Sequence, residues 1–243
     1  MIIIGFKLIL GDCLEKMREM QSQSVDVVFT SPPYNDSGTT ELDKEKKRHM
    51  KYENFEFRED WFDWQCECID EMVRVCQRMV LYNIQALLSN KADVYRMIGK
   101  YADTIHQILI WYKPNAQPQS YPNRIGNSYE MVFILKGKQF KNLEVASEHY
   151  NNVIVKNISA NHVYSDQHRA LMSEPFCDEI IREFTKPGET ILDPFMGLAT
   201  TGISCYRQGR NFIGIEIHEP YFNIAKERLE AEQAQMSLFD GGE

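Results

Sequence analysis

The sequence predicts one α/β domain in which short apolar strands alternate with amphipathic helices. Two observations lead to this prediction. A β-branched run at residues 25–29 ends in a Pro-Pro loop, and a second run at residues 190–192 leads through a glycine-bearing turn into a helix. No internal repeat divides the chain, and 243 residues are enough to bury one sizeable core. We therefore treat residues 1–243 as a single domain.

The remaining elements follow from apolar spacing along the chain. Period-2 or continuous apolar runs predict further strands at residues 7–10, 80–82, 106–112, 129–135 and 211–217. Helical spacing predicts helices at residues 61–78, 86–101 and 176–184, and a closing helix from residue 221. Lys186-Pro187-Gly188 is a typical helix stop. Strands and helices thus alternate along most of the chain.

Composition excludes several classes of protein. The first ten residues are apolar but have no small-residue cleavage site, so they predict a strand rather than a signal peptide. No other apolar run approaches the roughly 20 residues of a membrane helix, and we expect a soluble, cytoplasmic protein. The six cysteines show no paired ligand spacing, so we expect reduced thiols and no metal.

The net charge of −8 is unevenly distributed. Residues 216–243 carry a net charge of −5, whereas residues 112–170 carry +3. A local excess of positive charge suits contact with a phosphate backbone, although such segregation also occurs on ordinary surfaces.

The stretch Thr30-Ser31-Pro32-Pro33-Tyr34-Asn35 is the first candidate site. Its two prolines fix φ and keep the preceding residues extended, so the carbonyls of Ser31 and Pro32 are fixed acceptors outside any helix. Tyr34 adds a flat apolar face beside them. A planar ring that bears an amino group could stack on this face and donate to the carbonyls. The alternative is a simple Pro-Pro turn after a strand.

Residues 191–202 read Ile-Leu-Asp-Pro-Phe-Met-Gly-Leu-Ala-Thr-Thr-Gly. Together the two stretches resemble the motifs of the DNA methyltransferases that modify exocyclic amino groups with S-adenosylmethionine. The catalytic motif of that family is Asp/Asn/Ser-Pro-Pro-Tyr/Phe, and its cofactor motif is Asp-Pro-Phe-x-Gly-Ser-Gly-Thr-Thr. The catalytic motif comes first here, which resembles the permuted β group. Leu198 and Ala199 depart from the cofactor motif.

The resemblance implies a class I methyltransferase fold, Rossmann-like, with a mixed seven-stranded sheet. The fold would be circularly permuted, so that the chain's own N-terminal strand follows the closing helix in the sheet. The family also implies a bacterial or phage-encoded enzyme, as in restriction–modification systems. Its reaction would transfer a methyl group from S-adenosylmethionine to the amino group of a base flipped out of double-stranded DNA.

The resemblance also implies site residues. The catalytic group would be Ser31, Pro32, Pro33 and Tyr34. The cofactor-binding group would be Asp12, Cys13, His168, Asp193, Pro194, Phe195, Gly197, Thr200, Thr201 and Glu216. Asp12 could equally cap the helix that follows it. Glu216 ends a strand about 20 residues after the glycine turn, a position that suits hydrogen bonds to ribose hydroxyls.

Three polar segments are expected to contact DNA. Residues 36–60 form a predicted mobile loop with Lys46, Lys47 and Arg48, for which a solvated loop is the alternative. The connection between strands 106–112 and 129–135 contains Lys113, Asn115 and Arg124. Residues 136–167 correspond to the family's target-recognition region, which is small here. A second subunit of a homodimer could supply part of the recognition.

The target base is less closely defined. Ser-Pro-Pro-Tyr favours N4 of cytosine, with N6 of adenine as the alternative, because the family uses Asp-Pro-Pro-Tyr more often for adenine. The chain has no Pro-Cys loop that would suit methylation of a ring carbon. Two other classes stay open: a protein or RNA amide methyltransferase, and a catalytically silent DNA-binding relative whose altered turn at Leu198-Ala199 has lost the cofactor.

Residues 233–243 form a predicted flexible tail. The segment Gln235-Met236-Ser237-Leu238-Phe239 resembles the peptide by which bacterial polymerases and repair proteins bind the replication sliding clamp. Gln235, Leu238 and Phe239 would be the anchors of such an interaction. In the alternative, Leu238 and Phe239 fold back onto the protein's own surface.

Overall fold

The computed structural model describes residues 5–35, 58–116, 125–158 and 171–240, with only the backbone described for residues 236–240. Its helices are α1 (Cys13–Glu19), α3 (Trp61–Val75), α4 (Lys91–Lys100), α5 (Glu174–Phe184), α6 (Thr200–Arg207) and α7 (Glu219–Asp240). Its strands are β1 (Phe6–Leu10), β2 (Val25–Thr30), β3 (Cys76–Ile84), β4 (Ile105–Tyr112), β5 (Tyr129–Lys136), β6 (Val153–Val155), β7 (Thr190–Asp193) and β8 (Asn211–Glu216).

The strands form one mixed sheet in the order β1-β8-β7-β2-β3-β5-β4-β6. The first five of these strands are parallel, and β5 is antiparallel to both β3 and β4. The predicted α/β class is confirmed, but the described sheet has eight strands rather than seven. The additional strand is β6, which is three residues long and lies within the predicted target-recognition region. It pairs with β4 in parallel.

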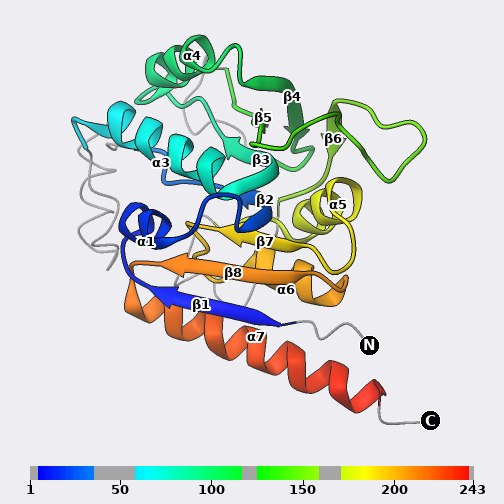
Figure 1. Cartoon of the computed structure of the whole chain (residues 1–243). Helices are drawn as coiled ribbons and strands as arrows, with labels where there is room; N and C mark the ends of the chain where they lie inside the picture. The colour runs from blue at the N-terminus through cyan, green and yellow to red at the C-terminus, as the bar shows by residue number, and fades with distance from the viewer. Residues whose placement is uncertain (1–4, 36–57, 117–124, 159–170, 241–243) are drawn as a thin grey trace.

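The predicted circular permutation is confirmed by the place of the N-terminal strand. β1 is the edge strand and pairs in parallel with β8, with Phe6 opposite Phe212 and Leu10 opposite Glu216. Helix α7 follows β8 in sequence and runs back along both strands (Figure 1). The beginning and the end of the described chain therefore complete one half of the sheet together.

Two apolar cores lie on the two faces of the sheet. Along β5, Met131, Phe133 and Leu135 belong to the core under α1, α3 and α4, whereas Val132 and Ile134 belong to the core under α5, α6 and α7. This alternation is the period of two that any strand imposes on its side chains. Because both faces are covered, the strands are nearly continuous apolar runs.

Two predicted helix boundaries were wrong. Helix α3 ends at Val75 rather than at residue 78, because the chain from Cys76 pairs with β2 and is extended. Helix α4 begins at Lys91 rather than at residue 86, because the side chain of Asn90 accepts from the Leu87 amide at 2.7 Å and holds a turn there. Helix α7 is described through Asp240 and so overlaps the segment 233–243 for which a tail was predicted.

Candidate active site

The carboxyl ends of the parallel strands meet at one edge of the sheet and bring the two sequence motifs together. Strand β2 ends directly before Ser31, β7 ends at Asp193, and β8 ends at Glu216. Strand β7 pairs with both β2 and β8, so the three ends are neighbours. Ligands of doubly wound sheets bind at this edge because the loops diverge there.

The turn at residues 31–35, called the catalytic turn after its predicted role, is held by two side chains that had no predicted role in it. The indole nitrogen of Trp61 donates to the Pro33 carbonyl at 3.0 Å, and the amide of Asn90 donates to the Tyr34 carbonyl at 2.7 Å. Within the described part of the chain, no donor lies on the carbonyl of Ser31 or Pro32. The two predicted acceptors are thus the carbonyls that the protein leaves available.

Asn35 closes the catalytic turn in a left-handed conformation, with φ of 53°. Its side-chain amide donates to the Arg58 carbonyl at 3.1 Å and accepts from the Arg58 amide at 2.9 Å. The residues on either side of segment 36–57 are therefore joined at the catalytic turn. Asparagine tolerates this backbone region better than most residues, and here its side chain also replaces backbone pairing.

The hydroxyl of Tyr34 points into a polar cluster behind the turn. It donates to Glu130 at 2.8 Å and lies 2.9 Å from the Ser31 hydroxyl. Burial raises the pKa of Tyr34 well above its ordinary value, and the Glu130 carboxylate raises it further. Tyr34 therefore keeps its proton at any physiological pH.

Asp193 joins the turn at residues 194–199, called the cofactor turn after its predicted role, to strand β2. Its carboxylate is 1% exposed and accepts from the Thr30 hydroxyl at 2.6 Å and from the Phe195 amide at 3.1 Å. Burial raises the pKa of Asp193 to about 6, although the hydrogen bond from Thr30 opposes the shift. The predicted cofactor ligand is also the residue that fixes the turn against β2.

The turn between β7 and α6 has the geometry that glycine favours. Gly197 has φ of 51° and Ala199 has φ of 58°, so Ala199 adopts the left-handed region at a site where the family motif has glycine. That conformation costs an alanine about 1–2 kcal/mol. The changed residue therefore preserves the turn rather than abolishing it.

Glu216 is bound to the same turn. One carboxylate oxygen accepts from the Gly197 amide at 3.0 Å and the other from the His218 amide at 2.8 Å. Burial raises the pKa of Glu216, and these two amides oppose the shift. Beside it, the Thr200 hydroxyl is buried without a partner among the described residues. Acceptors and an unpaired hydroxyl suit a ligand with an ammonium group and ribose hydroxyls.

Other predicted cofactor residues have structural roles of their own. Asp12 caps α1, because its carboxylate accepts from the amides of Leu14 and Glu15 at 2.9 and 3.0 Å. The thiol of Cys13 is buried 4.0 Å from that of Cys68, so only the backbone of Cys13 is available to a ligand. Pro194 is buried in the turn, and Phe195 packs edge to face against Trp64 at 5.7 Å.

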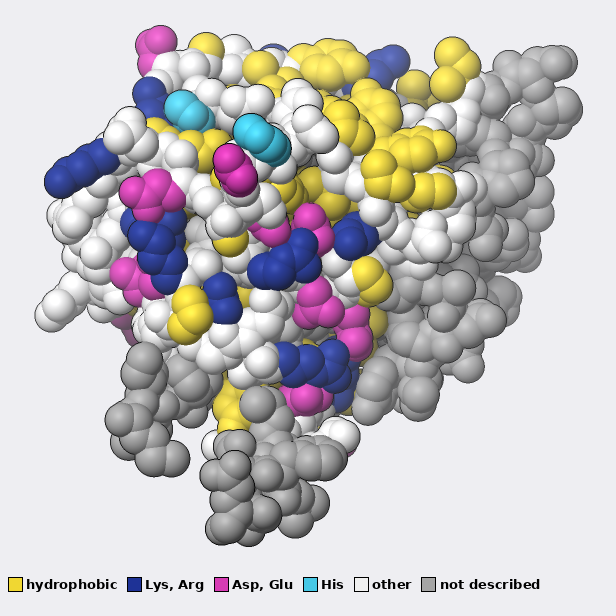
Figure 2. Space-filling model, turned by 90° about the vertical axis from the view of Figure 1, so that its right-hand side faces the viewer, with side chains coloured by type: hydrophobic (Ala, Val, Ile, Leu, Met, Phe, Trp, Pro, Cys, Tyr) yellow, Lys and Arg dark blue, Asp and Glu magenta, His cyan; other side chains and the backbone are white. Residues whose placement is uncertain are grey.

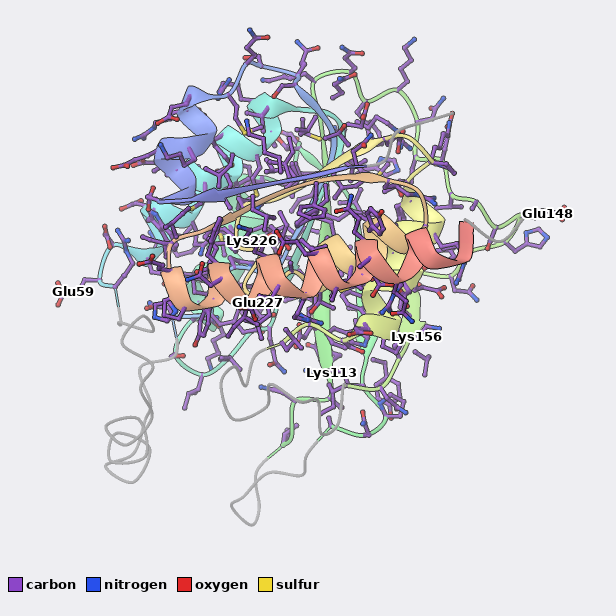
Figure 3. All side chains as sticks on the ribbon, turned by 90° about the horizontal axis from the view of Figure 1, so that it is seen from below. Glu59, Lys113, Glu148, Lys156, Lys226 and Glu227 are labelled. Atoms are coloured by element: carbon purple, nitrogen blue, oxygen red, sulfur yellow. The ribbon has the colours of Figure 1, made fainter. Side chains whose placement is uncertain are left out.

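The predicted DNA contacts divide into two groups. Lys46, Lys47, Arg48 and Arg124 lie outside the described residues, as does the predicted cofactor residue His168. The two described residues, Lys113 and Asn115, both have partners within the protein. Lys113 is 7% exposed and its ammonium pairs with Glu130 at 2.8 Å, and the side chain of Asn115 is bound to the backbone of Ile158. Lys113 and Lys156, labelled in Figure 3, follow the paired strands β4 and β6.

On one face of the described surface, charges of opposite sign lie close together (Figure 2). Lys156, one of the basic residues of segment 112–170, pairs with Glu179 at 3.3 Å. Figure 2 shows a face on which basic and acidic side chains are interspersed rather than gathered by sign. In the described part of the chain, no helix is long and apolar enough to cross a membrane and no cluster of His, Cys, Asp and Glu could hold a metal ion.

Comparison with known proteins identifies the class to which this geometry belongs. Residues 25–227 match the model of the DNA methylase family that comprises N6 and N4 enzymes, and the chain belongs to this family. Over 93% of its length the chain is 26% identical to the type II methyltransferase M2.DpnII of Streptococcus pneumoniae, of which 90% is covered. It is 36% identical over 131 residues to M.SmaI of Serratia marcescens, of which it spans 44%.

Solved structures confirm the fold. The PvuII DNA methyltransferase, named as cytosine-N4-specific, superposes with a TM-score of 0.70 at 17% identity, covering 92% of this chain and 86% of that one. M1.HpyAVI in complex with S-adenosylmethionine gives a TM-score of 0.64 at 20% identity, covering 92% of this chain and 100% of that one. The chain thus belongs to the DNA amino-methyltransferase family that the motifs predicted, and it shares its fold with a protein solved in complex with S-adenosylmethionine.

Proposed function

We propose that the chain methylates N4 of cytosine at specific sites in double-stranded DNA. The observation that supports the amino group as target is the pair of available carbonyls at Ser31 and Pro32, next to the ring of Tyr34. Serine at the first position of the motif and the fold shared with the cytosine-N4-specific PvuII enzyme favour cytosine. N6 of adenine is the second candidate.

The turn would act by orientation and fixed dipoles. A target base must leave the duplex stack, which costs a few kcal/mol, and stacking on Tyr34 offsets about 1–3 kcal/mol of that cost. The carbonyls of Ser31 and Pro32 accept the two amino hydrogens and draw the nitrogen lone pair out of conjugation with the ring. The lone pair is then directed at the reacting methyl group.

The cofactor turn would hold the methyl donor at the same edge. Bound S-adenosylmethionine supplies an electrophilic methyl group on a sulfonium centre. Asp193 would accept from its ammonium group and Glu216 from its ribose hydroxyls, while Gly197 allows close approach of the backbone. No phosphate is present in this cofactor, so the turn requires no cluster of basic residues.

The target base can be read directly from DNA made in a cell. A plasmid is propagated with the gene expressed in a bacterial strain without DNA methyltransferases of its own, then digested to nucleosides and analysed by mass. We expect N4-methylcytosine, absent from a plasmid propagated with the Tyr34→Ala variant. N6-methyladenine would replace the cytosine proposal by the second candidate. Unmodified plasmid DNA, together with new amide methylation in the RNA or protein of the same cells measured by mass, would favour the amide methyltransferase class.

Cofactor affinity should depend on pH through Asp193. Its pKa of about 6 means that the carboxyl is increasingly protonated below pH 6, and an ammonium ligand requires the ionised form. Binding below pH 6 must therefore release a proton, and the affinity should fall by up to about tenfold for each unit of pH. Calorimetric titrations at pH 5, 6 and 7 measure this. The Asp193→Asn variant should show a flat profile, and an equal slope in both proteins would contradict the assignment.

Further partners remain predictions. Lys46, Lys47, Arg48 and Arg124 are proposed phosphate contacts, and a second subunit is a proposed source of additional recognition. The proposed sliding-clamp peptide falls on the last turns of α7, where Gln235 is exposed and the backbone of Leu238 and Phe239 is helical. A clamp would therefore have to bind a helical end or unwind it.

A further inference from the structure

A buried polar cluster lies directly behind the catalytic turn. It joins Ser31 and Tyr34 to Asn83 of β3, Glu130 of β5 and Lys113 after β4, so it ties four strand ends together. Asn83, Lys113 and Glu130 are 1%, 7% and 8% exposed. Burying an ammonium and a carboxylate is costly even when they are paired.

The contacts form a continuous network around the Glu130 carboxylate. One of its oxygens accepts from Lys113 at 2.8 Å. The other accepts from the Tyr34 hydroxyl at 2.8 Å and from the Asn83 amide at 2.6 Å. The Asn83 amide also lies 3.2 Å from the hydroxyl oxygens of both Ser31 and Tyr34. The short contact to Glu130 fixes the amide orientation, because an amide oxygen there would face a carboxylate oxygen.

Counting protons in this network determines what Ser31 can offer to a ligand. Tyr34 has one hydroxyl proton, and it is donated to Glu130, which can only accept. In the 2.9 Å contact between Ser31 and Tyr34, Ser31 must therefore be the donor. The only proton of Ser31 is thereby committed inside the protein. Its oxygen can still accept a hydrogen bond, but it cannot donate one to a ligand.

The same network leaves a further acceptor without a partner. The carbonyl oxygen of the Asn83 side chain is buried and unpaired among the described residues, while its NH₂ group has three acceptors within reach of its two hydrogens. The Ser31 hydroxyl and the backbone carbonyls of Ser31 and Pro32 are acceptors at the adjacent turn. A group with two N–H donors complements such a set, whereas a keto oxygen finds no donor in it.

We propose that Asn83, Glu130 and Lys113 are positioning residues that fix the proton of Tyr34 and thereby make the Ser31 hydroxyl an acceptor, which shares a hydrogen of the target amine with the neighbouring backbone carbonyls. This inference rests on the proposed methyl transfer to an amino group. It also gives Lys113 a role different from the phosphate contact predicted from the sequence, because its ammonium is the partner of the Glu130 carboxylate.

A double-mutant cycle tests the proposal. In Glu130→Gln, the NH₂ group of the new amide must face either the Lys113 ammonium or the donors of Tyr34 and Asn83. In both orientations, a hydrogen-bond donor of the glutamine faces a donor of its neighbour. We expect the single-turnover rate of methyl transfer to fall about 10²-fold, because the turn loses its fixed orientation. The affinities for cofactor and for DNA, measured separately, should stay within about twofold of wild type.

The second side of the cycle removes the opposing donor. Lys113→Met alone leaves the buried carboxylate without its counter-ion and should also slow the transfer. In the double variant Glu130→Gln with Lys113→Met, the amide oxygen can face Tyr34 and Asn83 while its NH₂ group faces methionine. The double variant should therefore be faster than Glu130→Gln alone, a non-additive result that reports direct coupling.

Glu189→Gln is the matched control. It removes another half-buried ion pair of the same sheet, that of Glu189 with Arg78 at 2.6 Å, at the opposite end of β3. We expect the wild-type rate from it. If Glu130→Gln fails to bind cofactor, Tyr34→Phe decides instead, since it removes only the hydroxyl that receives the Ser31 proton, and a loss of about tenfold is expected.

Three results would overturn the proposal. They are a wild-type rate in Glu130→Gln, a fold-decrease of the rate in the double variant equal to the product of the two single fold-decreases, or a wild-type rate in Tyr34→Phe. Each of these tests requires that the wild-type protein methylates DNA. A wild-type protein that binds cofactor and transfers no methyl group to DNA would instead refute the proposed function itself.

Discussion

Replacing Tyr34 by alanine is expected to lower the rate of methyl transfer to DNA by about 10²-fold or more, while the cofactor still binds. Stacking of the extruded base contributes about 1–3 kcal/mol by itself, and orientation of the amino group depends on the same residue. The Tyr34 hydroxyl also anchors the turn on Glu130, at 2.8 Å. Asp193, Gly197 and Glu216 lie at the ends of β7 and β8 and in the turn before α6, and their described hydrogen bonds do not include this ring.

The measurement is a single-turnover assay with labelled cofactor, beside an equilibrium titration of the cofactor. Tyr95→Ala is the matched control, because Tyr95 is 60% exposed on α4 and has no part in the site. Its rate should equal that of the wild type. A rate for Tyr34→Ala within about threefold of wild type would remove Tyr34 from the catalytic group.

Replacing Asp193 by alanine is expected to weaken cofactor binding by about 10- to 100-fold. A hydrogen bond to a charged group contributes about 1.5–3 kcal/mol, and the variant loses the one proposed to the cofactor's ammonium. It also frees the Thr30 hydroxyl and the Phe195 amide, which now hold the turn at 2.6 and 3.1 Å. Asp193→Asn separates the two effects, because its amide oxygen can keep both internal bonds while the negative charge is lost.

Calorimetric titration of the cofactor distinguishes the possibilities. Asp193→Asn should bind almost as weakly as Asp193→Ala if charge dominates, and almost as tightly as wild type if only the turn geometry matters. Asp103→Ala, at an exposed position after α4, should leave the affinity unchanged. Wild-type affinity in Asp193→Ala would show that the carboxylate serves the fold alone.

The parts of the site that the sequence could predict are those encoded locally. A β-branched strand that ends in Ser31-Pro32-Pro33, and another that ends in Asp193, specify two loops at the carboxyl edge of a sheet whatever surrounds them. The glycine-bearing turn at Gly197 was likewise predicted, and the structure gives Gly197 a φ of 51°. Glu216 was predicted from its spacing after that turn, and the structure places its carboxylate on the Gly197 amide at 3.0 Å.

The missed features depend on contacts between distant segments. Asn90 and Trp61 donate hydrogen bonds to the catalytic turn. They are separated from their acceptors by 56 and 28 positions in the sequence, and no local pattern marks them. Lys113 and Glu130 meet only because β4 and β5 pair in antiparallel register, with Trp111 opposite Glu130. From sequence alone, a lysine in a polar connection is more simply interpreted as a surface contact with phosphate.

The predicted end of helix α3 was wrong for a related reason. Residues 76–78 continue the helical spacing of α3, yet the gain from pairing Cys76 with β2 exceeds the gain from one more helical turn. For Asp12, two roles were compatible with the sequence, and the structure places both of its hydrogen bonds on the first turn of α1. Such competition between local and tertiary preference is decided only by the neighbouring strands.

The most direct test of the central claim uses the purified protein, unmethylated duplex DNA as the only acceptor, and S-adenosylmethionine labelled in its methyl group. The DNA is then digested, and the position of the label on each nucleoside is determined. We expect label on an exocyclic nitrogen, and labelling slowed by about 10²-fold or more when Tyr34→Ala replaces the wild type. Label on a ring carbon, or DNA free of label although the cofactor binds, would contradict the central claim.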